Sequence, residues 1–490
     1  PILSLLIFIP LAGAVVLLML KSDLYARIWA LIVTLVNAAL SIPLYSYFDS
    51  STHLYQFTEH AEWISVLNIN YSLGIDGISL MLVLLATMIM PFCVLCSWSY
   101  IKTRVKEFML SMLVMEAAMV GVFCALDFVL FYIFWEMMLI PMYLLIAVWG
   151  GPNKTYASIK FFIYTLAGSV MLLVAIIALY LSTGSFSIPE LMQHTYPFGF
   201  QFWIFLAFAL AFAIKVPMFP FHTWLPAAHV EAPTAGSVIL ASILLKMGGY
   251  GFLRFCLPIA PHASIHFMPL MLGISLAGII YGGYVALGQS DMKKLIAYSS
   301  VGHMGFVTLG IFLFNSQGIE GAILQMINHG ITTGALFICV GIIYERTHSR
   351  MIGDNSGLGK LMPIYVTFFG IFSLSSLAFP GTNSFVGEFL VLIGAFMKNK
   401  MVAFIAIPGA IMAAAYMLRL LQKIVWGKRG DHPVYDLNVR EILTLIPLMI
   451  FVFWIGFGPS PFLKITHVSV EHLVQQINRA SEVAQGGGLR

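Results

Sequence analysis

The chain has 490 residues, of which 60% are hydrophobic and 9% are charged, and its mean hydropathy is +0.93. A soluble domain carries about 25% charged residues, so this composition excludes a soluble globular protein and predicts an integral membrane protein. The net charge of +4 is spread over the loops. It forms no basic patch, so nucleic acid is not expected as a partner.

Apolar runs from end to end predict about fourteen transmembrane helices in a single membrane domain, residues 1–490. The runs are too long and alternate too weakly for barrel strands, so we expect an all-α polytopic fold. The first run lacks a basic start and a small-residue cleavage site, which indicates a retained helix. In chain order the helices are expected at 2–20, 27–46, 75–100, 108–126, 128–149, 157–182, 201–226, 234–257, 266–289, 293–314, 319–345, 362–397, 402–426 and 441–459.

The lysines and arginines collect in alternate gaps between these helices. The odd-numbered gaps hold 16 of them, whereas the even-numbered gaps hold 3, namely Arg254, Lys398 and Lys400. Gap 47–74 carries three acidic residues and no lysine or arginine, and the gap after the seventh helix has no basic residue. Since cytoplasmic loops hold the excess of positive charge, both termini are expected on the non-cytoplasmic side.

Two of the predicted helices are interrupted. The seventh contains Pro217, Pro220 and Pro226, and the twelfth contains "LAFPGTNSFVGEF" around Pro380 and Gly381. Proline removes a backbone donor and kinks or ends a helix. Breaks five helices apart are typical of an internally repeated transporter, so we expect helices 4–8 (residues 108–258) and 9–13 (259–430) to be inverted repeats. Helices 1–3 (1–107) would precede them, and the last helix with a short tail (431–490) would follow.

Ionisable residues inside the apolar runs are the candidate functional residues. Each costs about 2.5–3.5 kcal/mol at a helix centre and needs a partner or water. No two are near neighbours on one helix, so they can meet only across helices and form a water-bridged proton relay. Arg419 lies closer to a helix end. The candidates are Glu116, Glu136, Lys215, Lys246, His303, His329 and Glu388.

The prolines after Lys215 suggest how a charge is tolerated there. A broken helix leaves carbonyls without partners, and their negative dipole end would face the ammonium. Gly248 and Gly249 beside Lys246, with Gly381 and Gly387 near Glu388, would give local backbone freedom.

Structural alternatives stand beside this hypothesis. Any buried pair could merely lock helices together, above all at Glu116 and His329. His222 and His229 lack an HExxH arrangement and are expected in a membrane-edge loop rather than at a metal. The five cysteines lie in apolar runs, where cysteine acts as a small hydrophobe.

Four segments carry a family resemblance: "WEMMLIPMYLLI", "KVPMFPFHTWLPAAHVEAPTAGSVILASILLKMGGYG", "SDMKKLIAYSSVGHMGF" and "FPGTNSFVGEFLVLIGAF". Together they resemble the antiporter-like subunits of respiratory complex I, the proton-pumping NADH:quinone oxidoreductase. The similarity runs over nearly the whole chain. The glutamate of "GEFLVL" resembles the M type, which is chain 4 in mitochondria.

This resemblance implies a proton-translocating subunit of the membrane arm in a bacterial inner membrane. Glu136 and Lys215 would be the coupled pair of the input half and Lys246 the central relay. His303 and His329 would extend the relay to Glu388, the terminal exchange site, whereas Glu116 has no motif support. Other membrane-arm subunits and the peripheral redox arm would be partners.

No cysteine cluster or glycine fingerprint suits a redox cofactor, so FMN, iron–sulfur clusters and quinone are expected on other subunits. Two related functions remain open. They are a subunit of a multisubunit cation/proton antiporter and a subunit of an ion-pumping membrane hydrogenase.

Overall fold

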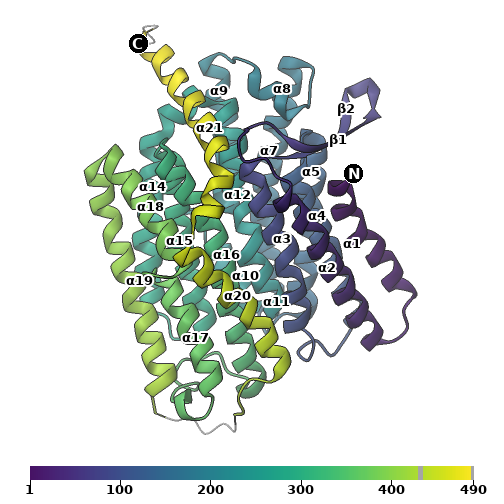
Figure 1. The fold of residues 1–490 in the computed structure, drawn as a ribbon, viewed down its shortest axis with the longest axis vertical. Coiled ribbons are helices and arrows are strands. Elements are labelled where there is room, and N and C mark those ends of the chain that lie inside the picture. The colour runs from purple at the N-terminus through teal and green to yellow at the C-terminus, as the bar shows by residue number, and fades with distance from the viewer. Residues whose placement is uncertain (429–433, 487–490) are drawn as a thin grey trace.

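The computed structural model describes residues 1–428 and 434–486 as a bundle of long helices with one small hairpin (Figure 1). Thirteen spans within these residues are long and apolar enough to cross a membrane. They are α1 (Ile2–Met19), α2 (Asp23–Ser46), α3 (Gly77–Cys96), α4 (Val105–Cys124), α5 with α6 (Phe128–Met137, Leu139–Trp149), α7 (Lys154–Thr183), α9 (Phe198–Lys215), the span Thr234–Ile259, α14 (Pro261–Leu287), α15 (Met292–Phe312), α16 (Ser316–Thr347), α19 (Lys400–Trp426) and α20 (Val439–Phe457).

The predicted twelfth helix is two shorter ones, α17 (Pro363–Ser376) and α18 (Asn383–Lys398), and the seventh continues after its break as α10 (Trp224–Glu231). All fourteen predicted helices are therefore present, and the all-α polytopic class is confirmed. Asp127 separates α4 from α5 because its carboxylate accepts the N–H groups of Val129 and Leu130 at 2.8 and 3.3 Å. A short helix, α8 (Ile188–Gln193), was not predicted.

Burial divides the helices into a centre and a rim. The most apolar window of α16 is entirely buried, as is that of Thr234–Ile259, whereas that of α20 is 33% buried and that of α1 39%. The central span comprises α11 (Thr234–Ile239), α12 (Leu245–Gly251) and α13 (Leu257–Ile259), joined by π-helical segments Leu240–Leu244 and Phe252–Cys256. The rim helices present their apolar faces outward, as lipid contact requires.

The segment 47–74, expected as a loop, holds an antiparallel hairpin of β1 (Gln56–Ile64) and β2 (Ile69–Ile75). Asn68 turns the chain with a φ of +53°, a conformation that asparagine tolerates. Irregular pairing interrupts the ladder at two points, so the side chains lack the regular alternation by which a strand is recognised in sequence.

The short tail expected after α20 is mostly a further helix, α21 (Ser460–Gly486), which was not predicted. Its buried residues recur every three or four positions at Phe462, Ile465, Ser469, Leu473 and Ile477, so one face packs on the bundle. It contacts α3, α13, α14 and α16. Figure 1 shows it ending at the same end of the bundle as the hairpin. We call this end the hairpin face.

His467 makes the contact of α21 with α16 dependent on pH. Its Nδ1 lies 2.6 Å from Glu320 Oε1, and this hydrogen bond raises the pKa of His467 above its ordinary value. The charged contact therefore stabilises the docking fully below the ordinary pKa of about 6.5 and is lost as pH rises through the raised value. Hydrogen exchange of the α21 amides should quicken across that window.

The same experiment on His467→Asn provides the control, because asparagine does not titrate in this range. Its α21 amides are expected to exchange quickly at every pH tested, after correction for the intrinsic rate. Equal pH dependence in both proteins would contradict a role for His467.

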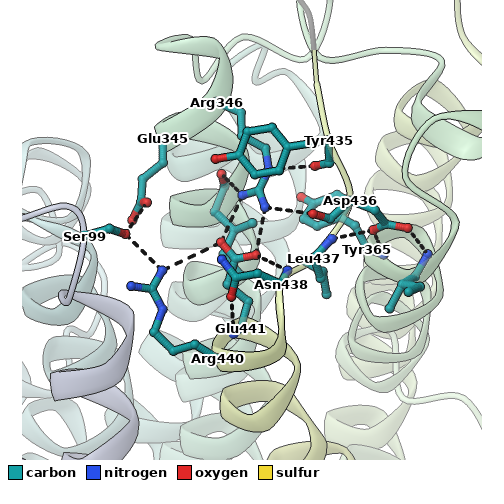
Figure 2. A network of polar contacts seen from close by, with 12 residues as sticks. Ser99, Glu345, Arg346, Tyr365, Tyr435, Asp436, Leu437, Asn438, Arg440 and Glu441 are labelled. Carbon is teal, nitrogen blue, oxygen red and sulfur yellow. Dashed lines mark hydrogen bonds and ion pairs between the residues drawn. The ribbon is translucent and has the colours of Figure 1, made fainter.

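The opposite end, which we call the basic face, is held by a network of polar contacts (Figure 2). Arg346 on α16 donates to Glu441 Oε2 at 2.7 Å and to the carbonyls of Tyr435 and Asp436. Asp436 in turn accepts the first N–H groups of α17. Arg440 donates to Ser99 at 2.9 Å. Residues from the gaps after the eleventh and thirteenth predicted helices thus meet at one end, as the distribution of basic residues predicts.

Candidate functional site

The break in the seventh helix runs from Lys215, the last residue of α9, to Trp224, the first of α10. The prediction that carbonyls at this break are left for the ammonium is wrong in part. The Ile214 carbonyl accepts the Trp224 indole N–H at 2.8 Å, and the Ala213 carbonyl accepts the N–H of Met218 at 2.7 Å. The turn supplies its own donors, because it folds back on the helix end.

Lys215 is buried, and its ammonium lies 5.0 Å from the ring centroid of Trp135. Glu136, next in sequence to Trp135, is near enough for its charge to act on Lys215, but no ion pair within 4.0 Å joins these two described residues. One carboxylate oxygen of Glu136 is buried without a protein partner. Glu136 and Lys215 are therefore close enough for their charges to interact but form no ion pair, and the Lys215 ammonium lies against the Trp135 ring.

Lys246 lies at the centre of the bundle and is fully buried. Its Nζ lies 2.5 Å from His329 Nδ1 on α16 and also donates to the Ala241 carbonyl, five residues earlier. The π-helical segment Leu240–Leu244 includes Ala241, and such segments are common at functional sites.

The two glycines beside Lys246 serve close packing and not the expected backbone freedom. Both lie inside helix α12, without a positive φ. A Cβ on Gly248 would lie 2.8 Å from the Phe212 carbonyl oxygen, and one on Gly249 would lie 2.6 Å from Met326 Sδ. The missing side chains let the central span approach both the break after α9 and helix α16.

The contacts continue from His329 to Glu388. The His329 and His303 rings lie 5.9 Å apart between centroids, and His303 Nδ1 lies 2.7 Å from Glu388 Oε1. Gln325 donates to the same oxygen at 3.1 Å, whereas Glu388 Oε2 and His329 Nε2 are buried without protein partners. Four of the predicted residues, Lys246, His329, His303 and Glu388, thus form one line across the middle of the bundle.

Amides and hydroxyls line the break between α17 and α18, and the sequence analysis did not identify them. The Asn383 amide oxygen accepts from Ser375 at 2.6 Å, and Asn328 donates to the Asn383 carbonyl at 2.7 Å. Gly381 has a φ of +94°, so the expected freedom is present at this glycine. The break therefore holds polar groups close to the line that ends at Glu388.

Glu116 on α4 lies apart from this line. It is fully buried, and its Oε1 accepts from Asn37 on α2 at 2.8 Å. None of its described polar contacts reaches another candidate. This arrangement fits the structural alternative of a contact between helices.

The expectation that His222 and His229 lie in a membrane-edge loop is wrong. Both are buried: His222 lies in the break and its ring is 4.9 Å from that of Tyr281, whereas His229 stacks on Phe337 at 4.5 Å. His229 lies near both Lys246 and Lys293, and neither of its ring nitrogens has a protein partner. The prolines around it resemble those of a loop, which is why the sequence pattern misplaced it.

Arg254 lies within the predicted helix 234–257, although its charge was counted with the loop that follows this helix. It lies in the π-helical segment Phe252–Cys256 and pairs through two nitrogens with the Asp76 carboxylate, at 2.5 and 2.9 Å. Burial has the largest single effect and opposes ionisation of Asp76, but the Arg254 guanidinium and the hydrogen bonds from Ser79 together outweigh it and keep the pKa of this carboxyl below its ordinary value. The same carboxylate caps α3, so this pair fixes the helix end under the hairpin.

Comparison with known proteins assigns this chain to a family. The family described as NADH:quinone oxidoreductase/Mrp antiporter, TM, matches residues 125–413, more than half of the chain. The chain belongs to this family. Members 46% identical to it include NADH-quinone oxidoreductase subunit M of Rhodobacter capsulatus, over 97% of this chain and 96% of that protein. NADH-ubiquinone oxidoreductase chain 4 of Arabidopsis thaliana is also 46% identical, over 96% and 97%.

Solved structures agree with this family assignment. A chain of respiratory complex I from Thermus thermophilus is 30% identical and matches with a TM-score of 0.89, over 97% of this chain and 99% of that one. A chain of the Mrp complex from Dietzia sp. DQ12-45-1b matches with a TM-score of 0.84 at 20% identity, over 99% of this chain and 56% of that one. The second match is a likeness of fold. Within the family, the resemblance to complex I subunits therefore extends from sequence to structure.

Proposed function

We propose that this chain is a proton-translocating subunit in the membrane arm of NADH:quinone oxidoreductase. The observation that carries the proposal is the line of Lys246, His329, His303 and Glu388 through the buried centre of the bundle. Buried ionisable groups are costly, and in membrane proteins a row of them marks an ion or proton path.

Each member of the line has chemistry suited to passing a proton. The Lys246 ammonium donates to His329 Nδ1, and an imidazole can accept on one nitrogen while releasing from the other. The 5.9 Å between the histidine rings leaves the second step to water. His303 then donates from Nδ1 to Glu388. Because the charge moves on, no ion is left stranded in hydrocarbon.

The input half would consist of Glu136 and Lys215, with His229 beside Lys246. Movement of the Glu136 carboxylate relative to Lys215 would change how firmly the ammonium holds its proton. The loose geometry of this pair, with a free carboxylate oxygen on Glu136, supports such a switch. His229 lies near both Lys293 and Lys246, so it would pass protons to the central lysine.

The remaining features of the proposal follow from family and charge. The basic face would be cytoplasmic in a bacterial inner membrane, with both termini on the other side. Helices 4–8 and 9–13 would be inverted repeats, since each unit holds five helices and an odd number places the second copy upside down in the membrane. FMN, iron–sulfur clusters and quinone would belong to other subunits, with which this non-redox chain assembles through the membrane and peripheral arms.

Replacing Lys215 with alanine tests the function. In inside-out membrane vesicles we expect NADH-driven proton uptake to fall by about a hundredfold, the usual contribution of a positioned proton-transfer group. The assembled complex should remain on native gels, because Lys215 contacts an aromatic face and not a locked partner. Lys160→Ala on α7 is the control and should pump normally.

The amount of assembled complex in the Lys215→Ala variant distinguishes a transport role of Lys215 from a structural one. If Lys215→Ala lost the assembled complex in proportion to its pumping, the charge would serve only to hold helices. The electron donor decides between the related functions. Pumping that follows a sodium gradient instead of NADH and quinone would favour the antiporter, and pumping with a different donor would favour the hydrogenase.

A further inference from the structure

A cavity opens into the second half of the bundle from the basic face. It has a volume of about 400 Å³ and lies between the end of α14, the start of α15, the segment after α16 and the end of α19. Asp354, Arg419 and Lys423 lie around it, and the last two are exposed, so the cavity reaches the surface. Polar atoms make up a large part of its wall, which suits water.

The inner end of the cavity is Tyr416 on α19, which is buried. Tyr416, Leu420 and Lys423 are spaced four and three residues apart and all line the cavity, so one face of the helix carries them. Tyr416 lies ten positions before Trp426, the last residue of α19, or about 15 Å along the helix. Since the 27 residues of α19 span about 40 Å, the cavity extends along rather more than a third of this helix.

The facing helix, α15, continues the path beyond the cavity. Leu295 lines the cavity, Ser299 follows one turn deeper and His303 one turn deeper again. Helix α19, which carries Tyr416, packs against both α18 with Glu388 and α15 with Ser299, so the charge of Glu388 acts on the Tyr416 phenol. Glu388 has one oxygen occupied by His303 and Gln325, and the other is buried without a protein partner.

We propose that Tyr416 is a further proton-relay residue, which joins the cavity at the basic face to Glu388. The inference rests on the proposed function, since it assumes that Glu388 carries protons. It adds a second access route, because the sequence analysis places Glu388 only at the output end. The carboxylate would then face both sides of the membrane, by way of Tyr416 and by way of the break before α18.

The chemistry needs no ionised phenol. A hydronium ion in the cavity gives a proton to the Tyr416 oxygen while the hydroxyl proton passes to the Glu388 carboxylate, directly or through one water. The net change is hydronium plus carboxylate to water plus carboxylic acid. Phenylalanine would keep the ring but lack both the acceptor and the donor.

Tyr416→Phe in the assembled complex tests the inference. In inside-out vesicles, proton uptake per NADH oxidised should fall by about a hundredfold, at the low end of what a proton-transfer group contributes. Tyr365→Phe is the matched control. Tyr365 is fully buried and donates to the Cys339 carbonyl at 3.2 Å, so its variant loses a hydroxyl of the same kind outside the cavity and should pump as the unaltered protein does.

Leu420→Cys tests the cavity without altering Tyr416. A membrane-impermeant cationic thiol reagent should react from the basic face in inside-out vesicles, and the modified protein should stop pumping. Leu418 is 48% exposed on the same helix but lies outside the cavity wall. The variant Leu418→Cys should therefore keep pumping whether or not the reagent modifies it. The Leu420→Cys experiment tests the access route even if the Tyr416→Phe variant does not assemble.

The outcomes separate the inference from the function on which it rests. Normal pumping by Tyr416→Phe and by modified Leu420→Cys, with pumping lost in Lys246→Met, would overturn the second access route alone. Normal pumping by Lys246→Met as well would overturn the proposed relay itself. Loss in Tyr416→Phe and modified Leu420→Cys, with both controls intact, supports the route.

Discussion

Replacing Lys246 with methionine is expected to stop proton pumping while leaving the complex assembled. Methionine has a similar length but no proton to give, so the line to His329 loses its first donor. We expect NADH-driven proton uptake in inside-out vesicles to fall by about a hundredfold or more. The fold should survive, because removing a buried charge also removes its desolvation cost.

Lys294→Met is the matched control, because Lys294 is exposed at the start of α15. It should pump normally. A second comparison uses His329→Gln, which keeps a hydrogen-bonding side chain beside Lys246 but cannot carry a proton. If either Lys246→Met or His329→Gln pumped at the normal rate, the line of contacts would be structural and the proposed relay wrong.

Replacing Asp76 with asparagine is expected to destabilise the protein by about 3–5 kcal/mol, the cost of leaving one charge of a buried pair unpaired. Asparagine can still cap α3, so the change isolates the loss of the carboxylate from Arg254. The measurement is the thermal unfolding midpoint of the purified complex in detergent. This midpoint should fall clearly below that of the unaltered protein.

The double variant Asp76→Asn, Arg254→Met distinguishes a stranded charge from lost packing. With both charges gone, most of the lost stability should return, because a buried pair as a whole contributes little. Double-variant stability as low as the sum of the two single changes would show that the pair contributes mainly through its neighbours, Tyr55 and Tyr250.

Each of the two helix breaks lies next to a buried ionisable residue. Lys215 is the last helical residue before the first break, and Glu388 lies in the second turn of the helix that follows the other. A broken helix exposes backbone groups only where it faces protein or a hydrated cavity. At the second break, Asn383 accepts from Ser375 and from Asn328, while Asn328 Oδ1 is buried without a partner among the described residues, so this segment is polar without carrying a net charge.

Most of the candidate residues could be found from sequence, because a charge inside an apolar run is visible without any knowledge of packing. Lys246, His329, His303 and Glu388 were all identified in this way. The contacts among these four residues could not be predicted from the sequence, because each residue lies on a different helix. Glu116 has the same kind of sequence signal, yet in three dimensions it contacts Asn37 and stays outside the line.

The errors share one cause. His229 and Arg254 stand beside prolines or near an expected helix end, where local pattern resembles a loop, but the surrounding helices bury them. The hairpin and α21 were missed because neither is long and apolar. Their stability comes from what they pack against, and Ser469 of α21, for example, accepts the first N–H of α3.

The sequence by itself determined the fourteen apolar helices, the two breaks, the polarity of the loops and the residues that bear charge in the membrane. Hydrophobic length, proline and charge act locally, so they are readable along the chain. Only the tertiary structure decided that Lys246 meets His329, that His303 meets Glu388, and that Tyr416 lies between a cavity and that glutamate. Contacts between helices depend on rotation and depth, which small residues such as Gly248 set through close packing.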